Sequence, residues 1–147
     1  MAHFTLPVSA GGPILDAFVG VSAARQMALE AVGQPVPALV RIRALVDTGA
    51  SATCIDPTVP SILGLTPTGN VSMMTPSTGA TPHSADVYDV GLLIPGPSFP
   101  PLTLPTIPVA AVDLLQSQGF HALIGRDILR NCVFHYNGST GLFTIAF

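Results

Sequence analysis

Asp47 is the residue with the clearest potential for chemistry, because it opens an Asp-Thr-Gly-Ala sequence directly after the apolar run Ala44-Leu45-Val46. This pattern predicts a strand that delivers one carboxylate into a tight turn, whose backbone amides are free to hold it. Gly49 has no Cβ and so lets the backbone approach the carboxylate closely. Two carboxyl groups about 3 Å apart cannot both ionise, so such a pair can act as acid and base together. The chain supplies one aspartate of this kind, and the chemistry requires a second.

The Asp-Thr-Gly triplet alone is equally consistent with a turn aspartate that caps its own backbone. A second segment separates the two interpretations: Ala122-Leu123-Ile124-Gly125-Arg126-Asp127-Ile128-Leu129. Together, the two segments resemble the retropepsin family, the single-domain aspartic proteases typified by retroviral proteases. The second segment matches that family's motif of two hydrophobic residues and Gly, followed by a helix start of the type Gly-Arg-Asp/Asn. The absence of Lys and the abundance of Ala, Gly and Pro are typical of a bacterial member.

The resemblance implies an all-β fold, a retropepsin-like closed β-barrel with one or two short helices. It implies an aspartic endopeptidase that hydrolyses peptide bonds through a water activated by a dyad of Asp47 from two subunits. Its partners would be a second copy in a C2 homodimer and a peptide or protein substrate in extended conformation, and no cofactor or metal is expected. The terminal segments 4–6 and 142–147 of both subunits would interleave into one sheet. One alternative is a non-catalytic peptide-binding or dimerisation module that retains the acid-protease fold. Another is a pseudo-dimeric partner of a different Asp-Thr-Gly protein.

The family's functional residues carry over onto three segments of this chain. The active-site loop would contain Thr48, Gly49 and Ala50, and the Thr48 hydroxyl would point across the two-fold axis. The hydrophobic-Gly motif would be Leu123, Ile124 and Gly125, and Gly125 would give the Asp47 loop room to pack. A mobile flap is expected over residues 70–94. Its substrate-binding residues would be Met74, Thr75, Pro76, Ser77, Thr78 and Gly79.

The chain departs from the viral pattern at Ser51. Viral members often carry an acidic residue at this position, and it pairs with the Arg of the Gly-Arg segment. Arg126 must therefore find another partner. Apolar residues near the motifs predict hydrophobic side chains on both sides of the cleaved bond. They are Val46, Ala50, Met73, Met74, Leu123 and Ile124.

The elements that position these residues are expected to be short, because 15 Pro and 14 Gly divide the chain. The expected strands are 4–8, 13–21, 37–46, 70–74, 85–94, 106–112, 121–125, 133–136 and 142–147. One longer helix is expected over 22–32, capped by Ser22 and stopped by Gly33. Short helices are expected after Asp113 and over 126–131, a loop or short turn over 57–65, and a loop over 95–105. We expect a single domain over 1–147, in which 1–35 is an N-terminal extension and 22–32 a helical insertion.

Composition excludes several functions. The net charge is −3 and the five basic residues are all Arg, which gives no electrostatic footprint for nucleic acid. No run approaches the ~18 apolar residues of a membrane span, and the N-terminus lacks the pattern of a secretion signal. Two cysteines are read as reduced thiols of a cytoplasmic protein. With 48% apolar and 9% charged residues, the chain is either a compact β domain or a subunit whose apolar surface is covered by another.

Other candidate sites fit less well. Asp56, Asp86, Asp89 and Asp113 lack a following Thr-Gly or Ser-Gly and are expected to be surface or capping residues. The segment 49–53 misses the second glycine of a serine-hydrolase elbow. The four histidines have no zinc spacing, and no glycine-rich phosphate loop is present.

Overall fold

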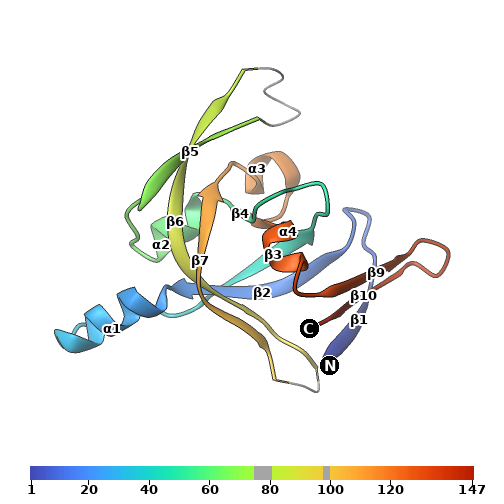
Figure 1. Ribbon diagram of the computed structural model, residues 1–147, viewed down its shortest axis with the longest axis horizontal. Helices are drawn as coiled ribbons and strands as arrows, with labels where there is room; N and C mark the ends of the chain where they lie inside the picture. Colours follow the sequence, from blue (N-terminus) through green and yellow to red (C-terminus); the bar gives the residue numbers. More distant parts are fainter. Residues whose placement is uncertain (75–80, 98–99) are drawn as a thin grey trace.

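The computed structural model describes residues 1–74, 81–97 and 100–147, and within them the chain is mostly β (Figure 1). The strands are β1 His3–Pro7, β2 Ile14–Val21, β3 Val40–Val46, β4 Cys54–Ile55, β5 Gly69–Met73, β6 His83–Ile94, β7 Leu102–Ala111, β8 Ala122–Ile124, β9 Val133–Asn137 and β10 Leu142–Ala146. The helices are α1 Ala23–Ala31, α2 Thr58–Ile62, α3 Leu115–Gln118 and α4 Arg126–Leu129.

The larger sheet closes into a barrel, as expected. Its order is β2-β3-β8-β4-β7-β6, the additional β2–β6 pairing closes the ring, and β5 extends the outer edge of β6. Strand β3 shows why these sequences form it: Ile42, Ala44 and Val46 are buried, whereas Arg41 and Arg43 between them are exposed. This alternation places one face of each strand in the core and the other outside.

A second sheet contains both ends of the described chain, in the order β1-β10-β9. Strand β10 lies in the middle, and its Phe143 and Ile145 are fully buried in the barrel core. Both edges of β10 are therefore paired within one chain, with β1 on one side and β9 on the other. An interleaved dimer sheet made through β10 would first have to break one of these pairings.

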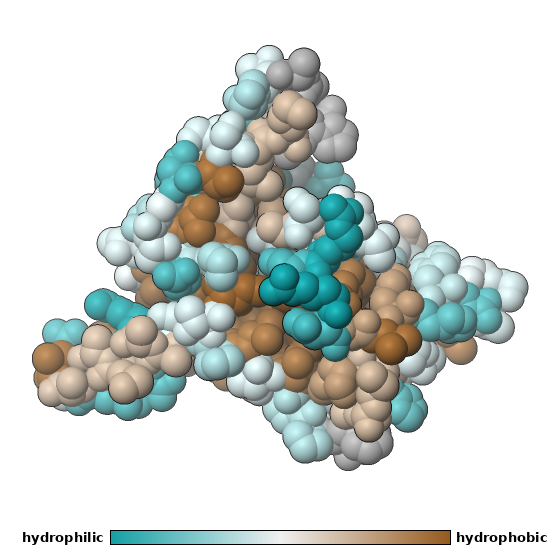
Figure 2. Space-filling model, viewed as in Figure 1, coloured by the Kyte–Doolittle hydropathy of each residue, from teal (hydrophilic) through white to brown (hydrophobic). Residues whose placement is uncertain are grey.

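Helix α1 forms where the sequence predicts it. The Ser22 side chain accepts a hydrogen bond from the Arg25 backbone N–H (3.3 Å), and Gly33 follows the helix in a left-handed conformation, with φ +68°. The helix projects from the barrel, on the side away from α4 and the end of β3 (Figure 1). It carries much apolar surface (Figure 2), and Met27 and Val32 are each 69% exposed.

Two expectations about local structure are wrong. Residues 58–62 form α2 instead of a loop, because the Asp56 carboxylate accepts the N–H of Thr58 and so starts the helix. Pro60 falls in the first turn, where a backbone N–H is not needed.

Strand β7 begins at Leu102, although residues 95–105 are expected to be a loop. Its ladder with β6 shifts register between Val90 and Leu92, opposite Pro105. A proline is tolerated at such an irregularity because no ladder hydrogen bond is lost. Among the helices within the described ranges, none is long and apolar enough to cross a membrane.

Candidate active site

The two motifs meet at the ends of two parallel strands. Strand β3 pairs with β8, with Leu45 opposite Leu123 and Val46 opposite Ile124. The Asp47 N–H then donates to the Ile124 carbonyl oxygen at 3.0 Å. The apolar runs bury the strands in the barrel, and the chain leaves the core at Asp47, which is half-buried.

The turn after β3 holds the Asp47 carboxylate from one side. The Gly49 N–H donates to Asp47 Oδ1 at 2.8 Å, and a Cβ on Gly49 would lie 3.0 Å from that oxygen. A side chain at this position would therefore crowd the carboxylate. Thr48 and Gly49 are exposed and Ala50 is half-buried, so the loop surface is open to a ligand or a second chain.

Gly125 allows the segment after the loop to pack tightly on β8. A Cβ there would lie 2.5 Å from the carbonyl carbon of Ala52 and 2.9 Å from the nitrogen of Thr53, closer than atoms can approach. The glycine of the hydrophobic-Gly motif thus makes room for the backbone just beyond the Asp47 loop.

Arg126 finds its partners in the backbone of the Asp47 loop. Its Nη1 donates to the carbonyl oxygen of Thr48 at 2.9 Å and to that of Gly49 at 3.4 Å. Its own backbone N–H donates to the Ala50 carbonyl oxygen at 3.0 Å. One residue of α4 therefore binds three consecutive loop carbonyls, and no acidic residue at position 51 is needed.

A second set of contacts, which sequence reasoning missed, fastens the far side of the loop. The Asp127 carboxylate accepts hydrogen bonds from the backbone N–H (2.9 Å) and hydroxyl (2.8 Å) of Thr53. The Gly125 N–H donates to the same hydroxyl at 3.1 Å. The available signal was an aspartate in the first turn of a helix, where a carboxylate is favoured by the helix dipole. Its partner Thr53 is distant in sequence and was not predicted.

Asp56 is a capping residue, and it is buried. Within the described residues its carboxylate accepts four hydrogen bonds: from the N–H (3.0 Å) and hydroxyl (2.6 Å) of Thr58 and from the N–H of Leu114 (3.0 Å) and Leu115 (2.8 Å). Burial alone would raise its pKa, but the hydrogen bonds from Thr58, Leu115 and Leu114 outweigh it and lower the pKa to about 2. Asp56 therefore joins the starts of α2 and α3.

The two cysteines are free thiols. Burial raises the pKa of the Cys54 thiol to about 11, and the nearby charges of Asp127 and Asp47 add to the effect. Cys54 thus stays protonated near neutral pH and is no nucleophile.

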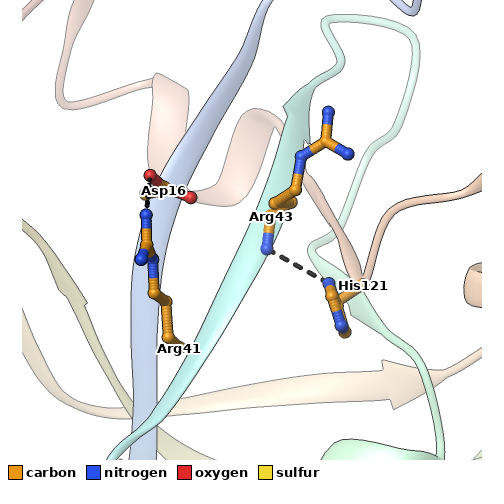
Figure 3. Close-up of polar contacts among 4 residues, drawn as sticks. All are labelled: Asp16, Arg41, Arg43 and His121. Carbon is orange, nitrogen blue, oxygen red and sulfur yellow. Dashed lines mark hydrogen bonds and ion pairs between the residues drawn. The ribbon is translucent and has the colours of Figure 1, made fainter.

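Polar contacts outside the loop are structural (Figure 3). Arg41 and Asp16 form an ion pair at 2.7 Å across β2 and β3. The Arg43 N–H donates to His121 Nδ1 at 3.2 Å, so that ring ties the start of β8 to β3. Within the described ranges, no group of three or more His, Cys, Asp or Glu side chains could hold a metal ion.

The expected flap corresponds to the hairpin of β5 and β6. Met74 follows β5 and is 71% exposed, whereas Thr75, Pro76, Ser77, Thr78 and Gly79 lie outside the described residues. Of the apolar residues near the motifs, Val46 and Ile124 are buried in the barrel core, so their side chains are not exposed to a substrate. Leu123 and Met73 are only partly buried and pack in a smaller cluster with Leu45.

Comparison with known proteins agrees with this geometry. Residues 32–128 match the aspartyl protease family. The fold is similar to that in the crystal structure of a retropepsin-like aspartic protease from Rickettsia conorii, with a TM-score of 0.61 and 18% identity over 98% of this chain and 89% of that chain. No curated protein matches the sequence significantly. The expected retropepsin-like fold is confirmed.

Proposed function

The chain belongs to the aspartyl protease family, and we propose that it is an aspartic endopeptidase whose active site contains Asp47 from each subunit of a C2 homodimer. The observation that carries the proposal is the burial and hydrogen bonding of the Asp47 carboxylate. It is half-buried at the end of a rigid strand and, among the described contacts, has one in-chain donor, the Gly49 N–H. Among the described residues no other donor fills its remaining lone pairs, which leaves them for a water molecule and for a shared proton.

In the proposed reaction, one Asp47 is ionised and the other protonated. The ionised carboxylate takes a proton from a water molecule, whose oxygen bonds to the scissile carbonyl carbon. The protonated one donates its proton to the carbonyl oxygen, which gives a neutral tetrahedral diol. Collapse of the diol breaks the C–N bond, and a proton passes to the leaving nitrogen. The assignment of acid and base belongs to the pair and not to either chain.

The substrate is proposed to be an extended peptide held under the hairpin of β5 and β6, with alternate side chains on apolar surface. Leu123, Leu45 and Met73 support this class of substrate, because they are partly buried and pack against the small buried cluster that contains Cys54. Hydrophobic residues at the cleaved bond are the expected preference. The hairpin would close on the substrate and exclude water, as lids of this type do.

The homodimer follows from the chemistry, since one carboxylate per chain supplies half of a dyad. Specific activity should fall on dilution below the dissociation constant of the dimer. Deletion of 142–147 is a poor test, because it removes the buried Phe143 and Ile145 and would unfold the barrel. Full specific activity in a preparation shown by light scattering to be monomeric would refute the shared dyad.

The function is tested with the wild type and Asp47→Asn against a peptide library at several pH values. Asn preserves the size of the side chain and loses the shared proton, so cleavage should fall by roughly 10³-fold or more. Circular dichroism should show an unchanged fold in the variant. Comparable turnover by Asp47→Asn would rule out Asp47 as the catalytic group. A dimeric wild type that binds peptides and never cleaves them would favour the binding module.

A further inference from the structure

One peptide group in the Asp47 loop is held at both ends. The carbonyl of Thr48 and the N–H of Gly49 belong to the same planar unit. The carbonyl oxygen accepts from Arg126 Nη1 at 2.9 Å, and the N–H donates to Asp47 Oδ1 at 2.8 Å. The guanidinium and the carboxylate are thus linked through a single rigid group.

This link has two physical consequences. Because the unit is planar, the contact that fixes its carbonyl also fixes the direction of its N–H. Because the acceptor binds a cation, the peptide is polarised and its N–H becomes a stronger donor to the carboxylate. Both effects hold the Asp47 carboxylate in one orientation and strengthen the hydrogen bond that it accepts from Gly49.

The charge of Arg126 is available for this role. Among the described residues, Arg126 forms no ion pair with a carboxylate, since the ion pair present is that of Arg41 with Asp16. Its backbone N–H also binds the Ala50 carbonyl oxygen, which anchors the start of α4 to the loop. Because Ser51 is neutral, it does not compete with the loop carbonyls for the Arg126 guanidinium.

We propose that Arg126 is a positioning residue for the reaction and acts on Asp47 through the Thr48–Gly49 peptide. The proposal rests on the proposed function. Arg126 does not touch the substrate; it orients the amide that orients the carboxylate. Lys in its place would be a point charge on a flexible stem and would restore the effect only in part.

The test compares Arg126→Met and Arg126→Lys with a matched control, Arg130→Met. Arg130 follows α4, is exposed, and has no side-chain hydrogen bond or ion pair among the described contacts. Arg126→Met should lower kcat about 10- to 100-fold with KM changed by less than about twofold. The acidic limb of its pH–activity profile should move up by about 0.5 pH unit. Arg126→Lys should lie between, and Arg130→Met should match the wild type.

Stability and dimer affinity are measured for every variant, and kcat is compared well above the dimer dissociation constant. If Arg126→Met fails to fold, Arg126→Lys decides by the same split between kcat and KM. Equal kinetics and pH profiles for the Arg126 and Arg130 variants would overturn the proposal. So would a loss of activity fully explained by loss of dimer.

A second readout does not depend on turnover. The amide proton resonance of Gly49 should move upfield in Arg126→Met, because its hydrogen bond to Asp47 weakens, and stay in place in Arg130→Met. A wild type without peptidase activity would refute the proposed function, yet this shift would still support the link between Arg126 and Asp47. An unchanged Gly49 resonance in Arg126→Met would refute that link, even in an active enzyme.

Discussion

Asp47 and Asp56 each follow a strand that pairs with β8, yet their carboxylates are bound very differently. Asp47 follows β3, is half-buried and accepts one described hydrogen bond to its carboxylate, from Gly49. Asp56 follows β4, is 2% exposed and accepts four, two of them from the backbone of Leu114 and Leu115. Local sequence distinguishes them only by the Thr-Gly that follows Asp47 directly, since Asp56 is followed by Pro57 and Thr58.

The difference shows what separates a structural carboxylate from one available for chemistry. A carboxylate whose lone pairs are filled by amides and a hydroxyl satisfies helix ends and has no room for a water molecule. A carboxylate with one donor keeps lone pairs for a proton or a reacting water. Loss of the Asp56 carboxylate should therefore lower the stability of the fold, whereas loss of the Asp47 carboxylate should lower activity.

The largest effect on stability is expected for Asp56→Asn. The amide of Asn keeps one acceptor oxygen and turns an NH₂ group toward backbone donors, which leaves buried N–H groups unsatisfied. The free energy of unfolding should fall by about 3 kcal/mol. Urea titration followed by circular dichroism measures it, since the chain has no Trp. Asp47→Asn is the matched variant and should change stability by less than about 0.5 kcal/mol. Equal losses in the two variants would contradict the comparison.

Acid should weaken the fold through Asp56. Its pKa is about 2 in the folded chain against 3.8 ordinarily, so the folded state binds the proton less readily than the unfolded one. The stabilisation is present above about pH 4 and is lost as the pH falls through about 2, an effect of about 2 kcal/mol. Urea midpoints across this range should fall more steeply for the wild type than for Asp56→Asn. Parallel curves for the two proteins would show that another group is responsible.

The smallest effect is expected at Ala50, beside the Asp47 carboxylate. A methyl group cannot donate to Asp47, whereas a hydroxyl could and would favour the ionised form. Ala50→Ser should therefore move the acidic limb of the pH–activity profile down by about 0.5 pH unit, from a wild-type optimum at mildly acidic pH. Ala52→Ser, on an exposed residue of the same loop, is the control. A wild-type rate that rises steadily down to about pH 2 would contradict the role given to Ala50.

Much of the fold could be predicted where the deciding contacts are local. Ser22 and Gly33 set the limits of α1 through their own backbone neighbours. The apolar runs before Asp47 and Gly125 form β3 and β8, since alternating or continuous apolar residues must be buried whatever the partner. Of the two segments whose structure was predicted wrongly, 102–105 depends on a distant strand, whereas 58–62 depends on the nearby Asp56, whose orientation is set by its distant contacts to Leu114 and Leu115. The start of α2 needs the Asp56 carboxylate that also binds α3, and β7 needs a register shift in β6.

The sequence by itself determined the family and the fold class and predicted the class of chemistry. It placed Asp-Thr-Gly after one apolar strand and Gly125 after another. Both patterns consist of neighbouring residues and can be recognised in the sequence alone. Only the tertiary structure decided which aspartate carboxylate is filled with hydrogen-bond donors and which groups Arg126 binds. Two of the four donors to Asp56, from Leu114 and Leu115, and the carbonyls bound by Arg126 come from residues far along the chain. Hydrogen-bond partners depend on distance in space, which a linear pattern does not contain until the barrel has closed.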